Sequence, residues 1–561
     1  MPFFKKNFFL TVILALSFII SFIGVNYNLP LSTAVVDEIV ITSGALKMLA
    51  EKTPILSFVH SNYFPLSYYL YLPFLAVYIF YLKLFSPFDT FAKIKELGIL
   101  HTGNFLIVGR MISVLLGTAS VFLIYLIAQK LFKDKKTSLI ASLLFALSPL
   151  NVAMAHFARV WTIQIFFILL ATYFALKIFS ENVLNISYKK FIVLGILMGF
   201  AFASNIIGLL IYIPIMALIY FSCEFNRTKN FLIFLKSKKF LVLNIIVVLI
   251  IAATYFLNKT SFVNFLNGFL GNVVHGDNFF KVSFSEKWTY YFKVLFKYET
   301  MPFLLAMFSF PLIYRKDKKI FFFLLSGFFS FFFFLGPLGG FTQARYSMPM
   351  IPFLIFASAY LIKFFWDKKN KTIAFFLIAI AVFPSSFLVY KMDKVFLNNG
   401  SDIVFYSWML NNIPNNSRTL FINNYFLQDI ILTKDSINRI KKFSPDFYSS
   451  RMAYLLDTPT NKYNEPAYDA YQDTIICNWP KEEIINAKFD YIIATEGILN
   501  EISSSGEINL CGMRKIKISG EKIIYQSSHD IFFNKEDPIL GPIDYFNNIK
   551  KLGLKFLVYK L

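Results

Sequence analysis

Two carboxylates and three arginines are the residues of this chain whose types and positions point to chemistry. Asp37 and Glu38 are adjacent and follow the first apolar segment, whereas Arg110, Arg159 and Arg345 lie in or beside later apolar segments. A carboxylate can take the proton of an acceptor hydroxyl, and arginine can hold a phosphate through two parallel hydrogen bonds. Brought together, these residues would suit the transfer of a group from a phosphate.

The composition indicates a polytopic membrane protein. Of the 561 residues, 57% are hydrophobic and 71 are Phe, and the run 321–334 carries no charge. Soluble domains are about 45–50% apolar, so a soluble fold would not bury this much apolar surface. The net charge of +22 is therefore assigned to basic loops that orient the helices and not to nucleic-acid binding.

Eleven apolar segments predict membrane-spanning helices, since a helix crosses a bilayer with about 20 apolar residues. The expected spans are 8–25, 105–131, 138–155, 160–179, 190–204, 205–221, 240–257, 301–314, 320–336, 349–363 and 371–390. Lys5 and Lys6 precede the first, and no small-residue cleavage site follows it. We expect a retained anchor with a cytoplasmic N-terminus.

A further segment, 64–85, is long enough to cross but is expected to lie along or dip into the outer leaflet. If it does not cross, the dense basic clusters of the chain share the side of Lys5 and Lys6, as the positive-inside rule favours. These clusters are 130–136, 177–190, 222–239, 315–319 and 363–371. Pro65, Pro73 and several Tyr residues suit a broken, interfacial helix.

This topology places the three arginines at the extracytoplasmic face. The segments expected there are a first outer loop, 26–104, with juxtamembrane helices, a turn at 151–159, a long loop at 258–300, a segment at 337–348, and the tail. Each arginine could instead extend its side chain to lipid headgroups. Because basic residues at the outer face run against the orienting bias, anion binding is the favoured interpretation.

The composition changes at about residue 391, so the predicted domains are 1–390 in the membrane and 391–561 outside it. The tail carries a helical pattern at 401–413 and strand-like runs at 418–423 and 490–495, which predict a small α/β domain. Cys477 and Cys511 lie in this domain. They would pair in an oxidising compartment, and two free buried thiols are the alternative.

The membrane part resembles the polyprenyl-phosphate-sugar glycosyltransferases of family 39 and their relatives, including the protein O-mannosyltransferases and the lipid-A aminoarabinose transferase. The similarity covers roughly residues 10–365 and rests on motifs in a fixed order. They are "DE" (37–38), "YFPLSYYLYLPF" (63–74), "GRMISVLLGTASVFLIYLIAQKLF" (109–132), "LLFALSPLNVAMAHFARVWTIQIFFILLATYFAL" (143–176), "VVHGDNFFKVSFSEKWTYYFKVLFKYETMPFLL" (273–305) and "ARYSMPMIPFLIFASAYL" (344–361).

The resemblance implies the GT-C fold and a sugar transfer, with inversion, from an undecaprenyl- or dolichyl-phosphate donor to a protein, lipid or glycan acceptor. Asp37 would be the catalytic base with Glu38 beside it, and the three arginines would surround the lipid phosphate. Further candidate site residues are His275, His60, Tyr346 and Trp288. Asp37 could instead be a first-turn helix acid, and Trp288 an interfacial anchor.

Some positions depart from the family pattern. Trp161 and Thr162 stand where many relatives have an Asp, and 63–74 lacks the family's His. We expect no required cofactor; the alternative is a divalent metal held by His60, His275, Asp277 and Glu38, since zinc favours such ligands.

The alternative function is a polytopic transporter of a lipid-linked or small solute. Transporters usually carry inverted repeats and helices broken near the midplane. No similarity between the two halves is visible in this sequence.

Overall fold

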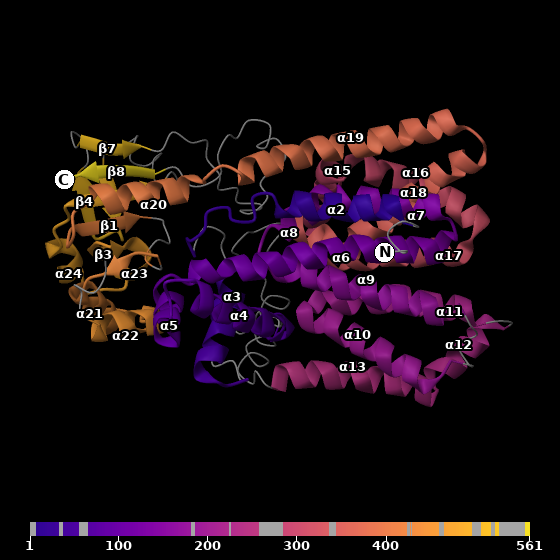
Figure 1. Cartoon of the computed structure of the whole chain (residues 1–561), viewed down its shortest axis with the longest axis horizontal. Helices are drawn as coiled ribbons and strands as arrows, with labels where there is room; N and C mark the ends of the chain where they lie inside the picture. Colours follow the sequence, from indigo (N-terminus) through magenta and orange to yellow (C-terminus); the bar gives the residue numbers. More distant parts are fainter. Residues whose placement is uncertain are drawn as a thin grey trace. The chain divides into compact units, whose positions relative to one another are not determined.

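The computed structural model of the chain is mostly helical, with a mixed β-sheet near the C-terminus (Figure 1). It describes residues 7–32, 38–54, 65–180, 186–223, 226–256, 284–335, 344–422, 427, 429–458, 465–495, 507–517, 522–526 and 556–561. The chain forms two compact units. The membrane unit is Met1–Val25, Val40–Ala76 and Val108–Asp393, and the sheet unit is Asn26–Ile39, Val77–Ile107 and Lys394–Leu561.

Each predicted span coincides with a helix or a bent helix pair. The helices up to the long outer loop are α2 (Phe8–Phe22), α3 (Glu38–Glu51), α4 (Pro65–Phe85), α5 (Phe91–Leu100), η1 (Thr102–Phe105), α6 (Leu106–Phe132), α7 (Lys135–Ala146), α8 (Pro149–Ala155), α9 (Val160–Ile178), α10 (Tyr188–Ser204), η3 (Ile206–Ile211), α11 (Tyr212–Ser222), α12 (Arg227–Leu235) and α13 (Lys238–Phe256). Those after it are α15 (Phe284–Tyr298), α16 (Thr300–Lys316), α17 (Lys318–Leu335), η4 (Ala344–Met350), α18 (Ile351–Asp367) and α19 (Lys371–Phe396).

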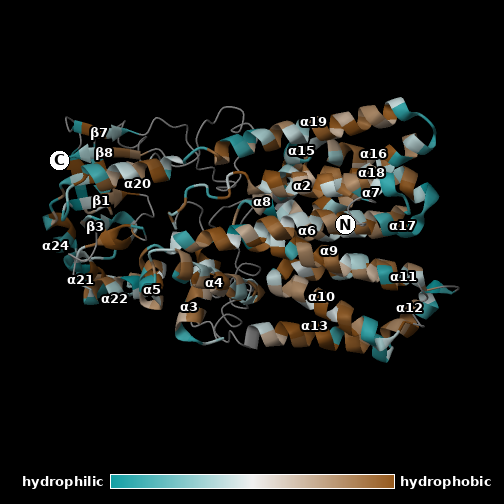
Figure 2. Cartoon of the chain, viewed as in Figure 1, coloured by the Kyte–Doolittle hydropathy of each residue, from teal (hydrophilic) through white to brown (hydrophobic). Residues whose placement is uncertain are grey.

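Among the described residues, six helices are long and apolar enough to cross a membrane, or eight if each of two bent pairs forms one span. The predicted count of eleven spans stays a prediction. Figure 2 shows hydrophobic residues along the membrane unit and hydrophilic residues gathered at one end of it, near α11, α12 and the loop between α18 and α19. The protein is thus a multi-pass membrane protein whose basic loops gather at one end of the helices.

The segment 64–85 differs from expectation in one respect. Its described part is the single helix α4, which runs through Pro73 for 21 residues, so the predicted break is wrong. A proline within a helix removes one backbone hydrogen bond, and a membrane helix can accommodate that loss. Since α4 is also long and apolar enough to span, its interfacial position stays a prediction.

The predicted span 138–155 is bent by 58° between α7 and α8. Ser148 is the N-cap of α8 and its hydroxyl accepts a hydrogen bond from the Asn151 backbone, while Pro149 occupies the first helical turn. Serine at the N-cap and proline at the first position are strong helix-start signals, and they end α7 before this point.

The tail contains the expected α/β domain. Its sheet has the order β2-β3-β1-β4-β8-β7, in which β2, β3, β1 and β4 are parallel and β8 pairs antiparallel with both of its neighbours, β4 and β7. The strands are β1 (Arg418–Ile422), β2 (Ile431–Leu432), β3 (Ala467–Gln472), β4 (Tyr491–Thr495), β7 (Lys522–Gln526) and β8 (Phe556–Lys560), with β5 (Glu507–Leu510) and β6 (Arg514–Lys517) forming a separate pair. The helices are α20 (Ser401–Asn412), α21 (Lys434–Phe443), η6 (Pro445–Phe447), α22 (Ser450–Asp457), α23 (Asp473–Ile476) and α24 (Lys481–Asn486).

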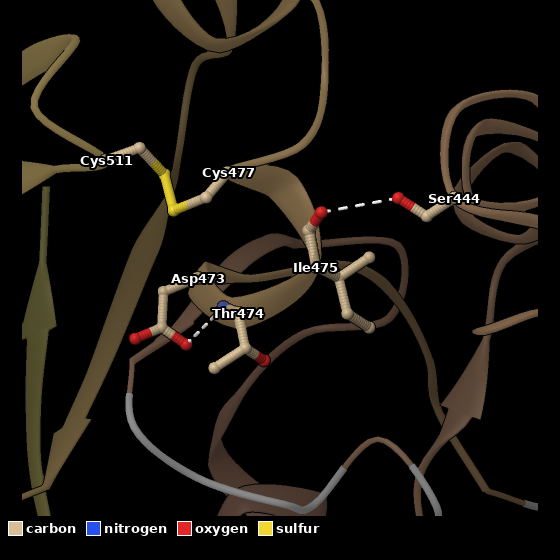
Figure 3. Close-up of a disulfide and its surroundings, with 6 residues drawn as sticks. All are labelled: Ser444, Asp473, Thr474, Ile475, Cys477 and Cys511. Carbon is tan, nitrogen blue, oxygen red and sulfur yellow. Dashed lines mark hydrogen bonds between the residues drawn. A yellow bond between two sulfur atoms is a disulfide. The ribbon is translucent and has the colours of Figure 1, made fainter. Parts of the chain in front are cut away.

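Cys477 and Cys511 form a disulfide, which selects one of the two predicted alternatives (Figure 3). Cys477 follows α23, and Cys511 lies in the turn between β5 and β6. The bond thereby links the β5–β6 pair to the chain after β3. In the same view the Ser444 hydroxyl donates to the Ile475 carbonyl oxygen at 3.3 Å, which ties α23 to the end of α21.

Candidate active site

The turn between α8 and α9, residues 156–159, is the centre of the candidate site. Arg159 is the N-cap of α9, has extended backbone angles and makes no side-chain cap hydrogen bond. The first backbone N–H groups of a helix have no partner within it, and they carry a partial positive charge. Together with the buried side chain of Arg159, the start of α9 favours an anion.

Arg345, from η4, adds a second cation to this place. Its guanidinium carbon lies 5.8 Å from the centre of the Trp161 ring and 5.9 Å from that of Tyr346. The two rings are themselves 5.0 Å apart in an edge-to-face arrangement. Trp161 is in the first turn of α9, so Arg345 is stacked beside the same helix start that Arg159 caps.

Several polar atoms at this place lack a hydrogen-bond partner. Within the described ranges, Nε and Nη1 of Arg345 and Nε1 of Trp161 are buried and have no acceptor. Buried donors in native proteins are nearly always paired, and leaving one unpaired costs about 1–3 kcal/mol. Three such donors around one helix start indicate a site built for an acceptor-rich group such as a phosphate.

Arg110 lies next to the same turn, because the residue before it, Gly109, packs against the turn. Gly109 of α6 packs so closely that a Cβ atom there would lie 2.7 Å from Cβ of Ala158 and 2.7 Å from a ring carbon of Tyr71. Only glycine permits this approach. Residue 158 precedes Arg159, so α6 brings Arg110 and α4 brings Tyr71 to the turn. The three arginines predicted from the sequence are therefore clustered around residues 156–161.

Arg110 and His156 also hold the chain where it leaves α2. Nη1 of the fully buried Arg110 donates to the carbonyl oxygen of Val25 at 2.9 Å. The ring nitrogens of His156 lie 2.8 Å from the Val152 carbonyl oxygen and 2.7 Å from that of Ile23. The positive charge of Arg110 at the end of α2 is favoured by the dipole of that helix. His156, which the sequence analysis did not single out, thus joins the turn to the end of α2.

The acidic residues are described only in part. Glu38 is the first residue of α3 and is fully buried. Asp37, His60, His275 and Asp277 lie outside the described residues, so the catalytic role predicted for Asp37 stays a prediction. Within the part of the chain that the structure describes, no group of three His, Cys, Asp or Glu side chains is placed to hold a metal.

Glu299 is a candidate that sequence reasoning missed. It stands between α15 and α16, is fully buried, and its Oε1 accepts a hydrogen bond of 2.5 Å from the hydroxyl of Ser148. Burial raises the pKa of Glu299 to about 8, although its hydrogen bonds to Ser148 and to the Leu150 backbone act the other way. Among described residues its Oε2 has no partner. The available signal was an acid directly before the apolar run at 301–314.

The aromatic residues of the long loop pack against α17 and against one another. Trp288, in α15, packs edge-to-face on Phe333 of α17 with ring centres 6.0 Å apart. Tyr291 is buried, and its ring lies 5.3 Å from that of Tyr290. These contacts hold α15 on the membrane unit; stacking of Trp288 on a sugar stays a prediction. Tyr346, by contrast, lies against Arg345 and Trp161.

Known proteins resemble this chain in sequence over part of its length and in fold over most of it. The sequence model of the dolichyl-phosphate-mannose-protein mannosyltransferase family matches residues 94–256, which include Arg110, the 156–159 turn and Arg159. The archaeal oligosaccharyltransferase AglB from Archaeoglobus fulgidus, solved with an inhibitory peptide and a dolichol-phosphate, has 13% identity and a TM-score of 0.50; the match covers 88% of this chain and 70% of AglB.

ArnT from Cupriavidus metallidurans, solved with undecaprenyl phosphate, has 11% identity and the same TM-score of 0.50, with coverage of 89% of this chain and 95% of ArnT. The chain therefore has the GT-C fold of these two proteins. At these identities the structural likeness establishes the fold, and the family match supports membrane glycosyl transfer as the general activity. A search of curated protein sequences found no match to this chain.

Proposed function

We propose that this GT-C protein transfers a sugar from a polyprenyl-phosphate-linked donor to an acceptor hydroxyl on the extracytoplasmic side of the plasma membrane, with inversion. The observation that carries the proposal is the guanidinium of Arg345, whose buried Nε and Nη1 have no acceptor among the described residues. A phosphate supplies the negative charge and the several acceptor oxygens that such buried donors require. The lipid phosphates named with AglB and ArnT supply a chemical precedent for such a ligand.

In the proposed step, the acceptor oxygen forms a bond to the anomeric carbon while the bond from that carbon to the phosphate oxygen breaks. The lipid phosphate leaves with the bonding electrons, and Arg345 and Arg159 stabilise its charge together with the start of α9. The hydroxyl proton passes to the Asp37 carboxylate, with Glu38 beside it. No metal is needed for this balance, because arginines and backbone N–H groups neutralise the leaving group.

The proposal is tested by incubating membranes that contain the protein with undecaprenyl- and dolichyl-phosphate sugars carrying a radiolabel, and by analysing the labelled protein, lipid and glycan fractions. We expect label in one acceptor fraction and an inverted linkage by NMR. Asp37→Asn, which keeps the size of the side chain but removes the base, should abolish transfer.

The matched control is Glu51→Gln, since Glu51 is an exposed acid at the other end of α3, with Lys47 3.7 Å away. It should leave transfer at the wild-type level. Transfer by Asp37→Asn at the wild-type rate would exclude Asp37 as the base. Solute uptake into sealed vesicles in the absence of any glycosyl transfer would support the transporter instead.

A further inference from the structure

The turn at the centre of the candidate site is carried by a very short helix. Helix α8, Pro149–Ala155, has seven residues and is followed directly by the turn 156–159. Its two ends lie about 10 Å apart, since a helix rises about 1.5 Å per residue. A group that fixes the start of α8 therefore also fixes the direction in which the helix delivers the turn, and with it Arg159.

The carboxyl group of Glu299 holds the start of α8. Its Oε1 accepts a hydrogen bond of 2.5 Å from the hydroxyl of Ser148, the N-cap residue of α8, and the Leu150 backbone makes a second hydrogen bond to the same side chain. The Ser148 hydroxyl in turn accepts from the Asn151 backbone nitrogen at 3.3 Å. The first N–H groups of a helix have no partner within it, so Glu299 completes the cap that Ser148 begins.

The contact between Glu299 and Ser148 is fully buried. It joins residues 151 positions apart in the sequence, so it links the end of the long outer loop to the bend between α7 and α8. Water does not replace a lost partner in the protein interior, and removal of one group leaves the other buried and unpaired at a cost. The bend therefore has one favoured arrangement while Glu299 is in place.

The segment that begins at Glu299 is itself fastened to α18. The hydroxyl of Ser358, on α18, donates to the Pro302 carbonyl oxygen at 2.5 Å, and the Phe303 backbone nitrogen donates to the Glu299 carbonyl oxygen at 2.7 Å. Ser358 and Phe303 are both buried. Helix α18 directly follows η4, which carries Arg345. Glu299 therefore stands between the support of Arg159, which is α8, and the support of Arg345, which is η4 with α18.

We propose that Glu299 is a positioning residue for the phosphate site: acting through Ser148, it holds α8 and the 156–159 turn in place against the segment that carries Arg345. The proposal rests on the function proposed above. Two arginines can share one phosphate only at a defined separation, and a displacement of about 1 Å can cost about 100-fold in rate.

The positioning role predicts a particular kinetic signature. The donor is a phosphate diester with one negative charge, whereas the leaving lipid phosphate is a monoester that carries about −1.5 to −2. Arginines that are out of place therefore lose more interaction in the transition state than with the bound donor. Loss of the Glu299 contact should lower kcat more than it raises the KM for the donor. It should also weaken the binding of the free lipid phosphate.

The test compares variants of the full-length protein in the labelled transfer assay and in binding of undecaprenyl phosphate without a sugar. Glu299→Ala removes both cap bonds and should lower kcat and raise the Kd for undecaprenyl phosphate, each about 10- to 100-fold. Glu299→Gln keeps an oxygen at the position of Oε1 and should restore most of both quantities. Ser148→Ala removes only the hydroxyl bond and should have a smaller effect, with little further loss when it is combined with Glu299→Ala.

Asn244→Ala is the matched control. Asn244 belongs to the same membrane unit but to α13, and its Oδ1 accepts a hydrogen bond of 3.0 Å from the hydroxyl of Tyr212 on α11. The variant thus removes a hydrogen bond between two helices without touching α8, η4 or α18 in the contacts described. It should lower the melting temperature and leave both kcat and the Kd for undecaprenyl phosphate at the wild-type level.

Wild-type kcat and Kd in Glu299→Ala would overturn the positioning role, and so would an equal loss of both in Asn244→Ala. If Glu299→Ala does not fold, Glu299→Gln and Ser148→Ala decide: a Gln variant as impaired as Ser148→Ala or more would contradict the role of Oε1 as an acceptor. If the wild-type protein binds undecaprenyl phosphate but transfers no sugar, the proposed function fails, whereas the Kd values still report whether Glu299 positions the phosphate site.

Discussion

Replacing Arg345 with methionine is the sharpest test of the phosphate site. Methionine approximates the length of the arginine stem and keeps contact with Trp161, but it lacks the two buried donors Nε and Nη1. Hydrogen bonds to charged groups contribute about 1.5–3 kcal/mol each, so two bonds to a phosphate amount to about 3–6 kcal/mol. With about 1.4 kcal/mol per factor of ten, kcat/KM should fall by about 10²- to 10⁴-fold.

Stability should change in the opposite direction. In the protein without ligand, the two donors of Arg345 are buried and unpaired among the described residues, and their removal relieves a cost of about 1–3 kcal/mol each. We expect the melting temperature of Arg345→Met to equal or exceed that of the wild type. Arg345→Lys keeps the charge but lacks the guanidinium donors, so its activity should lie between those of the wild type and Arg345→Met.

Both quantities are measured on the same purified protein, kcat/KM with labelled donor and the melting temperature without it. Arg227→Met is the control, because Arg227, the first residue of α12, is an exposed arginine that stacks on Phe221 at 5.4 Å. It should change neither quantity. Wild-type kcat/KM in Arg345→Met, or a fall in melting temperature that matches the loss of activity, would refute the reasoning.

Two further predictions concern Glu299 and the disulfide. The pKa of Glu299 is raised from 4.5 to about 8, so between these pH values the folded state binds a proton that the unfolded state does not. The wild-type protein should therefore lose stability relative to Glu299→Gln as the pH rises from about 4.5 to about 8. Thermal unfolding at each pH measures this, and parallel pH profiles of the two proteins would contradict it. Cys511→Ser opens a bridge with a sequence separation of 34 residues and should lower the unfolding free energy of the sheet unit by about 4 kcal/mol in denaturant titrations. Cys223→Ser, at the free buried cysteine of the membrane unit, is the control, and an equal loss in both variants would speak against the disulfide.

The helices were predictable because the apolar runs that specify them are local. The boundaries of α6, α9 and α10 agree with the predicted spans to within a few residues. The bend before Pro149 has a local signal in the Ser-Pro pair, which the prediction of a single span at 138–155 did not use. Pro73 misled in the other direction, since a proline inside a membrane helix does not necessarily end it.

The candidate site was predictable in its residue types and not in its construction. The charge pattern indicated that Arg110, Arg159 and Arg345 would share a face, and the structure gathers them around one turn. The contacts that gather them, Gly109 on Ala158 and Arg345 on Trp161, depend on the packing of distant segments. No local pattern reports such packing, and the predicted roles of these residues stay predictions.

Two other features have no sequence signal of their own. Glu299 resembles any loop acid until its burial against Ser148 is known. In the sheet unit, the hydrogen bond from the Ser32 backbone to the Asp429 carboxylate joins residues 397 positions apart, so it follows only from the fold.

The sheet unit combines segments from the two ends of the chain, so its parts are synthesised at different times. Its first stretches end at Ile107 and its main part begins at Lys394, so a ribosome adding about 5–20 residues per second needs about 15–60 s to make the intervening helices. Strand β8, which ends at Lys560, lies between β4 and β7 in the sheet. In the proposed topology, Leu31 crosses the membrane early in synthesis. It can be buried against the sheet only after nearly the whole chain has been translated. A premature stop before β8 would leave the first outer loop without its core, although every membrane helix had been made.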